Sequence, residues 1–236
     1  DVAVAKEIFN FFMGRYKATN KDEEMDLPVE KRDFGGILAS LNAYSGAPIE
    51  SAAVAVTAAL GLNLIRYKNY SKDETYDKLL EHIAYWLSQM QGSDGGVKDA
   101  PRRPGKITEP NAIAVAFLIK YATIDPAYEK KRDALRAWMP SVVSDGLLMT
   151  REGPYNIHDE SVPKHTADAQ TRWMLALGPE EFMEVRGWTS DEEYWGYLEK
   201  VKTTFGVTVD VIGYGQTIYK NVEMLGMIPN STLGFP

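Results

Sequence analysis

The sequence predicts an all-α domain built from repeated helical hairpins. Helical segments alternate between amphipathic and apolar composition, and short motifs recur at the starts of the apolar segments and at the ends of the amphipathic ones. A helix that is apolar all round has to be buried on every side, whereas an amphipathic helix covers it from outside. The alternation therefore predicts an inner set of helices wrapped by an outer set.

The helices are placed by the spacing of their apolar residues. Residues 2–16 carry a helical apolar stripe, and residues 17–33 are charged and irregular. Further helices are expected at 49–67, 72–91, 111–122, 126–143, 166–177, 190–205 and 216–225. The amphipathic helices 72–91, 126–143 and 190–205 are each followed by a more apolar one. Residues 203–212 alternate like a strand, but one such segment makes no sheet.

End signals support these boundaries. Pro126 stands in a first-turn position, and Ser190 opens a helix with an acidic first turn. Gly178 and Gly226 directly follow two of the apolar helices, where a glycine readily ends a helix.

A repeat register is expected at the starts of the apolar helices. Glu50, Glu109 and Asp168 stand 59 residues apart in each case. Trp86 and Trp138 each precede a Ser-Asp-Gly turn, at residues 93–95 and 144–146. No linker is evident, so a single domain is expected over 1–236, with a helix and irregular arm at 1–47 and hairpin repeats at 48–226.

Residues 91–96, Gln-Gly-Ser-Asp-Gly-Gly, resemble the Gln-x-x-Asp-Gly-[Ser/Gly] turn of the α/α-toroid superfamily. That group includes terpenoid cyclases, protein prenyltransferase subunits, family 10 pectate lyases and, more distantly, six-hairpin glycosidases. The resemblance implies a full or incomplete toroid over residues 48–226, with a ligand funnel at the end where the inner helices begin. About four hairpins are counted here, which leaves the ring open or completed by other chain.

The motifs of several toroid activities are absent. The sequence has neither the Asp-Asp-x-x-Asp nor the Asp-x-Asp-Asp cluster of isoprenoid enzymes, and it lacks the cysteine of a prenyltransferase zinc site. The resemblance then implies a polysaccharide lyase or glycoside hydrolase. The alternative is a non-catalytic glycan-binding or protein-binding domain that assembles into a larger exported protein.

Titratable residues are densest between 151 and 173. A lyase needs a base and a positive charge for the substrate carboxylate, and a hydrolase needs two carboxylates. The candidate catalytic residues are Tyr155, His165, Asp168, Arg172, Glu109 and Glu160. The alternative interpretation is a polar surface loop that caps a helix.

Candidate substrate-binding residues are of three kinds: polar residues at the starts of inner helices, aromatic residues, and arginines of a basic loop. They are Trp173, Tyr214, Gln170, Gln216, Asn111, Arg102 and Arg103. Aromatic rings stack on sugars but also pack helix layers. Polar residues at helix starts are equally typical of capping, and the two arginines fit either a clamp for an anion such as a uronate or a solvated loop.

Composition excludes other partners. A net charge of −7 argues against nucleic acid, and the longest apolar run, 52–62, is too short to span a membrane. The chain has no cysteine, and His158, Asp159 and His165 match no tight ligand spacing, so neither a metal nor a cofactor is expected.

The chain begins with Asp1, so we expect a processed or excised piece that is extracellular or periplasmic. Its expected partners are an oligo- or polysaccharide and further domains of a longer chain.

Overall fold

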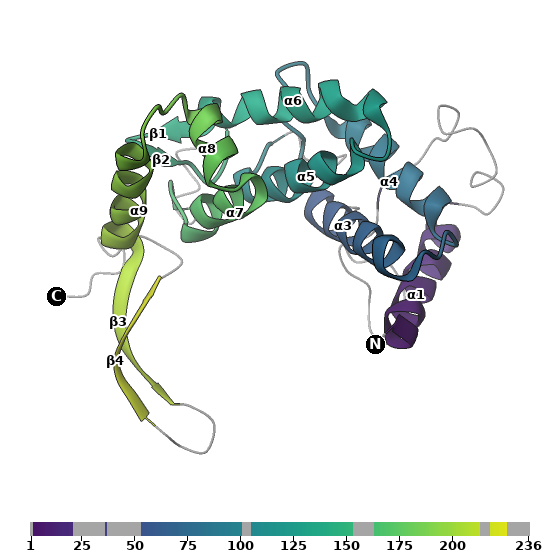
Figure 1. Ribbon diagram of the computed structural model, residues 1–236, viewed down its shortest axis with the longest axis horizontal. Helices are drawn as coiled ribbons and strands as arrows, with labels where there is room; N and C mark the ends of the chain where they lie inside the picture. Colours follow the sequence, from purple (N-terminus) through teal and green to yellow (C-terminus); the bar gives the residue numbers. More distant parts are fainter. Residues whose placement is uncertain are drawn as a thin grey trace. The chain divides into compact units, whose positions relative to one another are not determined.

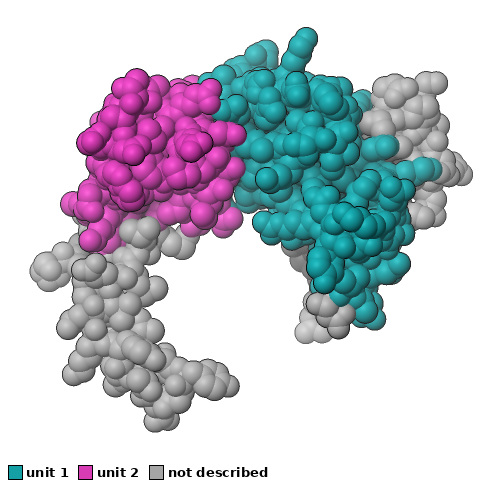
Figure 2. All heavy atoms as spheres, in the orientation of Figure 1, with its two compact units in different colours: residues 1–138 teal, residues 139–236 magenta. Residues whose placement is uncertain are grey.

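The structure is a computed structural model that describes residues 2–20, 36, 53–100, 105–152, 163–212 and 218–225. The chain divides into two compact units, Asp1–Trp138 and Met139–Pro236 (Figure 2). The described residues are mostly helical, and their strands form two short two-stranded sheets. The predicted all-α class is confirmed, and the single domain stays a prediction.

Unit 1 is helical in its described part (Figure 1). Its elements are α1 (Val2–Asn20), α3 (Val54–Ser71), α4 (Asp77–Met90), α5 (Thr108–Tyr121), the 3-10 helix η2 (Pro126–Tyr128) and α6 (Glu129–Trp138). Helix α3 packs against both α4 and α5, and α5 also packs against α6. The arrangement places α3 and α5 side by side.

Unit 2 combines short helices with two antiparallel ribbons (Figure 1). Its elements are η3 (Met139–Val142), β1 (Val143–Ser144), β2 (Leu147–Leu148), α7 (Ala167–Leu177), α8 (Pro179–Arg186), α9 (Asp191–Phe205), β3 (Gly206–Ile212) and β4 (Ile218–Leu225). Strand β1 pairs with β2, so that Val143 lies opposite Leu148. Strand β3 pairs with β4, with an irregularity between Val209 and Val211.

Burial follows the expected inner and outer characters in α5 and α6. Helix α5 buries Ala112, Val115 and Leu118 together with six of its other residues, which lie around the whole helix. In α6 only Leu135 and Trp138 are buried. Helix α4, which was expected to lie outside, buries eight of its fourteen residues, so the core of unit 1 is shared by α3, α4 and α5. Each large apolar side chain that leaves water contributes roughly 1.5–3 kcal/mol to this core.

The prediction of a helix at 216–225 is wrong. Residues 218–225 form strand β4, which pairs with β3 from the segment whose alternation had indicated a strand. Ile218, Tyr219 and Val222 are residue types that favour strands. Pairing with a neighbouring strand satisfies backbone groups that an isolated short helix leaves open.

Helix α1 is held to α3 and to the start of α4 by rings and by one carboxylate. The rings of Phe9, Tyr67 and Tyr76 meet edge to face, with centroids 5.1–5.7 Å apart. The Asp73 carboxylate accepts hydrogen bonds from Lys6 Nζ (3.0 Å) and Tyr67 Oη (2.9 Å). The side chain and backbone N–H of Thr75, followed by Lys6 and Tyr67, hold the pKa of Asp73 well below its ordinary value.

We expect α1 to loosen as the solution becomes acidic. A depressed folded-state pKa means that Asp73 contributes stability above the ordinary aspartate value, about 4, and that this contribution is lost as the pH falls below it. Protection of the α1 amides against hydrogen exchange, corrected for the pH dependence of exchange in an unfolded chain, should fall between pH 6 and pH 3. Asp73→Asn should exchange faster at neutral pH and lose most of the pH dependence; identical profiles for both proteins would contradict the assignment.

Candidate functional site

Two equivalent turns follow the outer helical segments. The first, residues 91–97, follows the end of α4, and the second, residues 143–148, follows the end of η3. In the first turn the Lys98 N–H donates to Met90 O (3.0 Å), and in the second the Met149 N–H donates to Val142 O (2.7 Å). The two turns therefore close in the same way, although only the first carries the full Gln-x-x-Asp-Gly-Gly pattern.

The first turn is held by a buried amide at the start of α5. Asn111 is fully buried. Its Oδ1 accepts from the Val97 N–H (2.7 Å), and its Nδ2 donates to Val97 O (2.8 Å) and to Ile107 O (2.8 Å). One side chain thus satisfies both backbone groups of Val97, as a neighbouring strand would.

The second turn is held by Gln170 in the same manner. Its Oε1 accepts from the Leu148 N–H (2.8 Å), and its Nε2 donates to Leu148 O (2.7 Å) and to Thr166 O (3.0 Å). The buried Tyr197 hydroxyl also donates to Oε1 (2.6 Å). Gln170, like Asn111, has no exposed surface, so each is a clamp between a turn and an inner helix.

The clamps share one register position. Asn111 and Gln170 each lie four residues after the N-cap of their helix, and so does the fully buried Thr57 of α3, whose Oγ1 donates to Ala53 O (2.8 Å). Two of the polar residues expected around a funnel at the inner-helix starts, Asn111 and Gln170, are bonded to backbone in the core. Thr57, which was not among those expected residues, shares their position in the helix.

The repeat register needs one correction. Residues 64–67, Leu-Ile-Arg-Tyr in α3, correspond to residues 118–121, Leu-Ile-Lys-Tyr in α5, a shift of 54 residues that also aligns the two N-caps. Glu109 therefore corresponds to Ala55, and Glu50 lies outside the described residues. The 59-residue spacing holds between Glu109 and Asp168, the second residues of α5 and α7.

The aspartate of each turn pairs with a cation just before the inner helix. In the first turn Asp94 pairs with Lys106, which directly precedes the N-cap of α5. In the second turn Asp145 Oδ2 lies 2.7 Å from Lys164 Nζ and 4.0 Å from His165 Nε2. The hydrogen bond from Lys164 is the main cause that lowers the pKa of Asp145. At the position where α5 is preceded by a lysine, α7 is therefore preceded by His165.

His165 is oriented by a backbone carbonyl. Its Nδ1 lies 3.0 Å from Leu148 O, and because a carbonyl oxygen only accepts, Nδ1 carries the hydrogen. In the neutral ring the lone pair is then on Nε2, the atom that faces the Asp145–Lys164 pair. The side chain is 12% exposed. A histidine held in one tautomer, with its basic nitrogen 4.0 Å from a carboxylate that itself pairs with a lysine, has a lone pair available to act as a general base.

The other expected site residues divide into three groups. Asp168 and Arg172 lie one turn apart on the exposed part of α7, with Oδ2 and Nη2 3.9 Å from each other, and Glu109 is half-buried in the first turn of α5. Trp173 is fully buried, as Asn111 and Gln170 are. Outside the described residues are Arg102, Arg103, Tyr155, Glu160, Tyr214 and Gln216.

Sequence reasoning did not select Asp145 or Lys164 as site residues. The Ser-Asp-Gly motif was interpreted only as a mark of hairpin geometry. One signal could have pointed to the pair. Lys106 and His165 occupy equivalent positions beside the aspartate of each turn, and the replacement of lysine by histidine there directs attention to the second turn.

A concavity in unit 1 lies at the C-terminal ends of α3 and α5, away from the first turn. It has a volume of about 370 Å³, and its lining includes Lys68, Asp77, Glu81, Tyr121 and Tyr128. Lys68 Nζ and Asp77 Oδ2 form a 2.6 Å ion pair, and burial raises the pKa of Tyr128 to about 12. Both tyrosines are therefore neutral hydroxyls at physiological pH.

Two kinds of site are not found in the described part of the chain. No group of three histidine, aspartate or glutamate residues there is placed to hold a metal ion. No helix within the same ranges has the length and apolarity needed to cross a membrane.

No protein-family model matches the chain, and no curated protein matches it.

Proposed function

We propose that this chain is a carbohydrate-active domain of the α/α-toroid type, acting outside the cytoplasm on a uronate-containing polysaccharide by β-elimination, with His165 as the base. The observation that carries the proposal is the geometry of His165, whose Nε2 faces the Asp145–Lys164 pair while Nδ1 is held on Leu148 O. The two equivalent turns and their amide clamps support a hairpin repeat of toroid type.

The proposed reaction uses one base and one cation. His165 Nε2 takes the proton on the sugar carbon next to the carboxylate, and the electron pair forms a carbon–carbon double bond. That pair expels the glycosidic oxygen on the adjacent carbon, which takes a proton from water. Lys164 binds the substrate carboxylate and stabilises the charge that develops there.

Asp145 occupies the place that this carboxylate would take. Its ion pair with Lys164 is exposed, with side-chain exposures of 74% and 48%. Because water screens exposed ion pairs and they contribute little free energy, a substrate carboxylate exchanges for Asp145 at little cost. Asp168 and Arg172, further along α7, extend the polar surface on which a polysaccharide would lie.

The test is turnover on a panel of polyuronates. Ultraviolet absorbance of the unsaturated product and the appearance of reducing ends should rise together. We expect His165→Gln to lower kcat by about 10²–10⁴-fold, and Lys164→Met to raise KM. Lys106→Gln changes the residue at the position equivalent to His165 in unit 1 and should leave turnover unchanged while the circular dichroism spectrum shows a folded protein.

Other outcomes point elsewhere. Reducing ends without unsaturated product would mean hydrolysis by carboxylates such as Asp168 and would overturn the role of His165. Saturable binding of a polyuronate without turnover at high protein concentration would support the non-catalytic glycan-binding alternative.

A further inference from the structure

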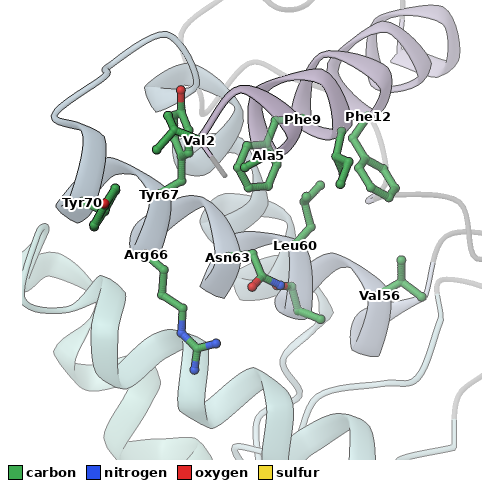
Figure 3. A pocket seen from close by; sticks show the side chains of 12 residues that line it. Val2, Ala5, Phe9, Phe12, Val56, Leu60, Asn63, Arg66, Tyr67 and Tyr70 are labelled. Carbon is green, nitrogen blue, oxygen red and sulfur yellow. The ribbon is translucent and has the colours of Figure 1, made fainter.

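An apolar groove runs between α1 and α3 in unit 1. It has a volume of about 790 Å³. Its lining includes Ile8, Phe12, Val56, Leu60, Asn63 and Tyr70. Figure 3 shows Phe9 and Phe12 of α1 above Leu60 of α3, with Asn63 further along the same helix. Val2 and Ile8 of α1, which line the groove, are 40% and 50% exposed, which is unusual for large aliphatic side chains gathered on one helix.

The neighbouring pair of helices has an equivalent groove that is filled. Helix α3 packs against both α4 and α5, and Gly61 marks the point of closest approach. A Cβ atom at Gly61 would lie 2.5 Å from the Phe117 ring of α5 and 3.1 Å from Cγ2 of Ile83 in α4. Helix α3 thus packs between α4 and α5, and Gly61 allows it to approach both helices closely.

The register places the α1–α3 groove at the same position. By the shift of 54 residues that aligns α3 with α5, Asn63 corresponds to Phe117 and Leu60 corresponds to Ala114. Phe117 and Ala114 are fully buried, whereas Asn63 is exposed and lines the groove together with the buried Leu60. The face of α5 that packs against a neighbouring helix therefore corresponds to the face of α3 that lines the groove.

Glycine contacts give the same correspondence independently. A Cβ at Gly36 would lie 2.6 Å from the Trp86 ring of α4, and a Cβ at Gly96 would lie 2.5 Å from Nε1 of Trp138 in α6. Gly36 and Gly96 each precede an apolar residue in the sequence. A glycine that precedes α3 thus packs on the tryptophan of α4 as a glycine that precedes α5 packs on the tryptophan of α6.

We propose that the α1–α3 groove is the docking site for an inner helix of one further helical hairpin of this repeat type. The expected helix resembles α3 and presents a glycine or alanine opposite Asn63, flanked by aliphatic side chains. Repeat proteins bury the apolar face of each unit against the next, and a terminal face left apolar needs a partner. This inference does not depend on the polysaccharide chemistry proposed for unit 2.

Because the chain has no cysteine, the test can use single-cysteine variants of the full protein. An environment-sensitive dye is attached at Tyr70→Cys, on the rim of the groove, and the probe is a synthetic peptide with the α3 sequence, residues 53–71. We expect saturable binding with a blue shift of the dye. A short bis-maleimide should cross-link Asn63→Cys to a peptide carrying Gly61→Cys in higher yield than to peptides with the cysteine one or two residues away.

Matched variants separate groove binding from general stickiness. The double change Ile8→Glu with Val56→Glu should weaken peptide binding at least tenfold. Leu175→Glu removes a side chain that is 84% exposed on α7 and should leave binding unchanged. A peptide with Gly61→Leu should bind more weakly, since the equivalent seat on α4 and α5 approaches Gly61 too closely for a side chain.

Three results would overturn the proposal. They are the absence of saturable binding, equal binding by the groove variant, and cross-linking that ignores register. Light scattering on the protein alone distinguishes another occupant: a concentration-dependent dimer that the groove variant abolishes would assign the groove to a second copy of the chain.

Discussion

Replacing Gln170 by leucine is expected to destabilise unit 2 by about 3–5 kcal/mol, because the change strands buried polar groups. The Leu148 N–H, the Leu148 carbonyl and the Tyr197 hydroxyl all use the Gln170 amide. Burial raises the pKa of Tyr197, so its hydroxyl stays a neutral group that needs a partner. Leucine fills a similar volume, so the loss comes from hydrogen bonds rather than from a cavity.

Urea unfolding followed by circular dichroism measures this loss. Asn111→Leu should have a comparable effect on unit 1, because Asn111 holds Val97 through the same set of bonds. Asp168→Asn changes an exposed residue on the same helix as Gln170 and should shift the free energy of unfolding by less than about 0.5 kcal/mol. A loss below about 1 kcal/mol for both leucine variants would show that the clamps do not hold the turns.

The second large effect is expected for Gly95→Ala, at about 3 kcal/mol or more. Gly95 has φ of +97°, a conformation that residues with a Cβ rarely adopt. An added Cβ would also overlap the backbone carbonyl of Ala134 in α6. Relief requires α6 to move, which would disturb the hydrogen bond from Gln91 Nε2 to Lys131 O (2.9 Å).

Thermal unfolding compares Gly95→Ala with Gly105→Ala. Gly105 has no atom within 4 Å of its added Cβ, so its replacement should leave Tm nearly unchanged. If Gly95→Ala were as stable as the wild type, the close packing of the first turn on α6 would be contradicted.

Much of the fold follows from local pattern. Apolar spacing located the helix at 72–91, which occupies Asp77–Met90, and the caps at Gly178 and Ser190 are where α7 ends and α9 begins. These features depend on neighbouring residues in the chain, which a sequence displays directly. Helix α8 was not expected, although Pro179 followed by two glutamates is a helix-start signal.

Pairing between distant segments could not be predicted in the same way. Strand β4 forms because β3 lies beside it, and the apolar spacing of residues 216–225 suits a helix as well as a strand. Tertiary partners decide between the two.

The candidate site was predicted only in part. Polar residues at inner-helix starts were found from sequence, but capping, funnel lining and core clamping favour the same residue types there. Burial separates these roles, and it places Asn111 and Gln170 in the core while His165 keeps partial exposure. The tautomer of His165 depends on Leu148 O, a contact between residues 17 apart that no local pattern displays.

The central structural claim is that a buried side-chain amide serves as the strand partner of each turn, and amide hydrogen exchange of the wild-type protein tests it most directly. The Val97 and Leu148 N–H groups lie in turns, yet they donate to the Asn111 and Gln170 side chains in the core. We expect both to exchange as slowly as the core amides of α5 and α7. Exchange at the rate of exposed loop amides would contradict the clamp and, with it, the repeat on which the proposed function is built.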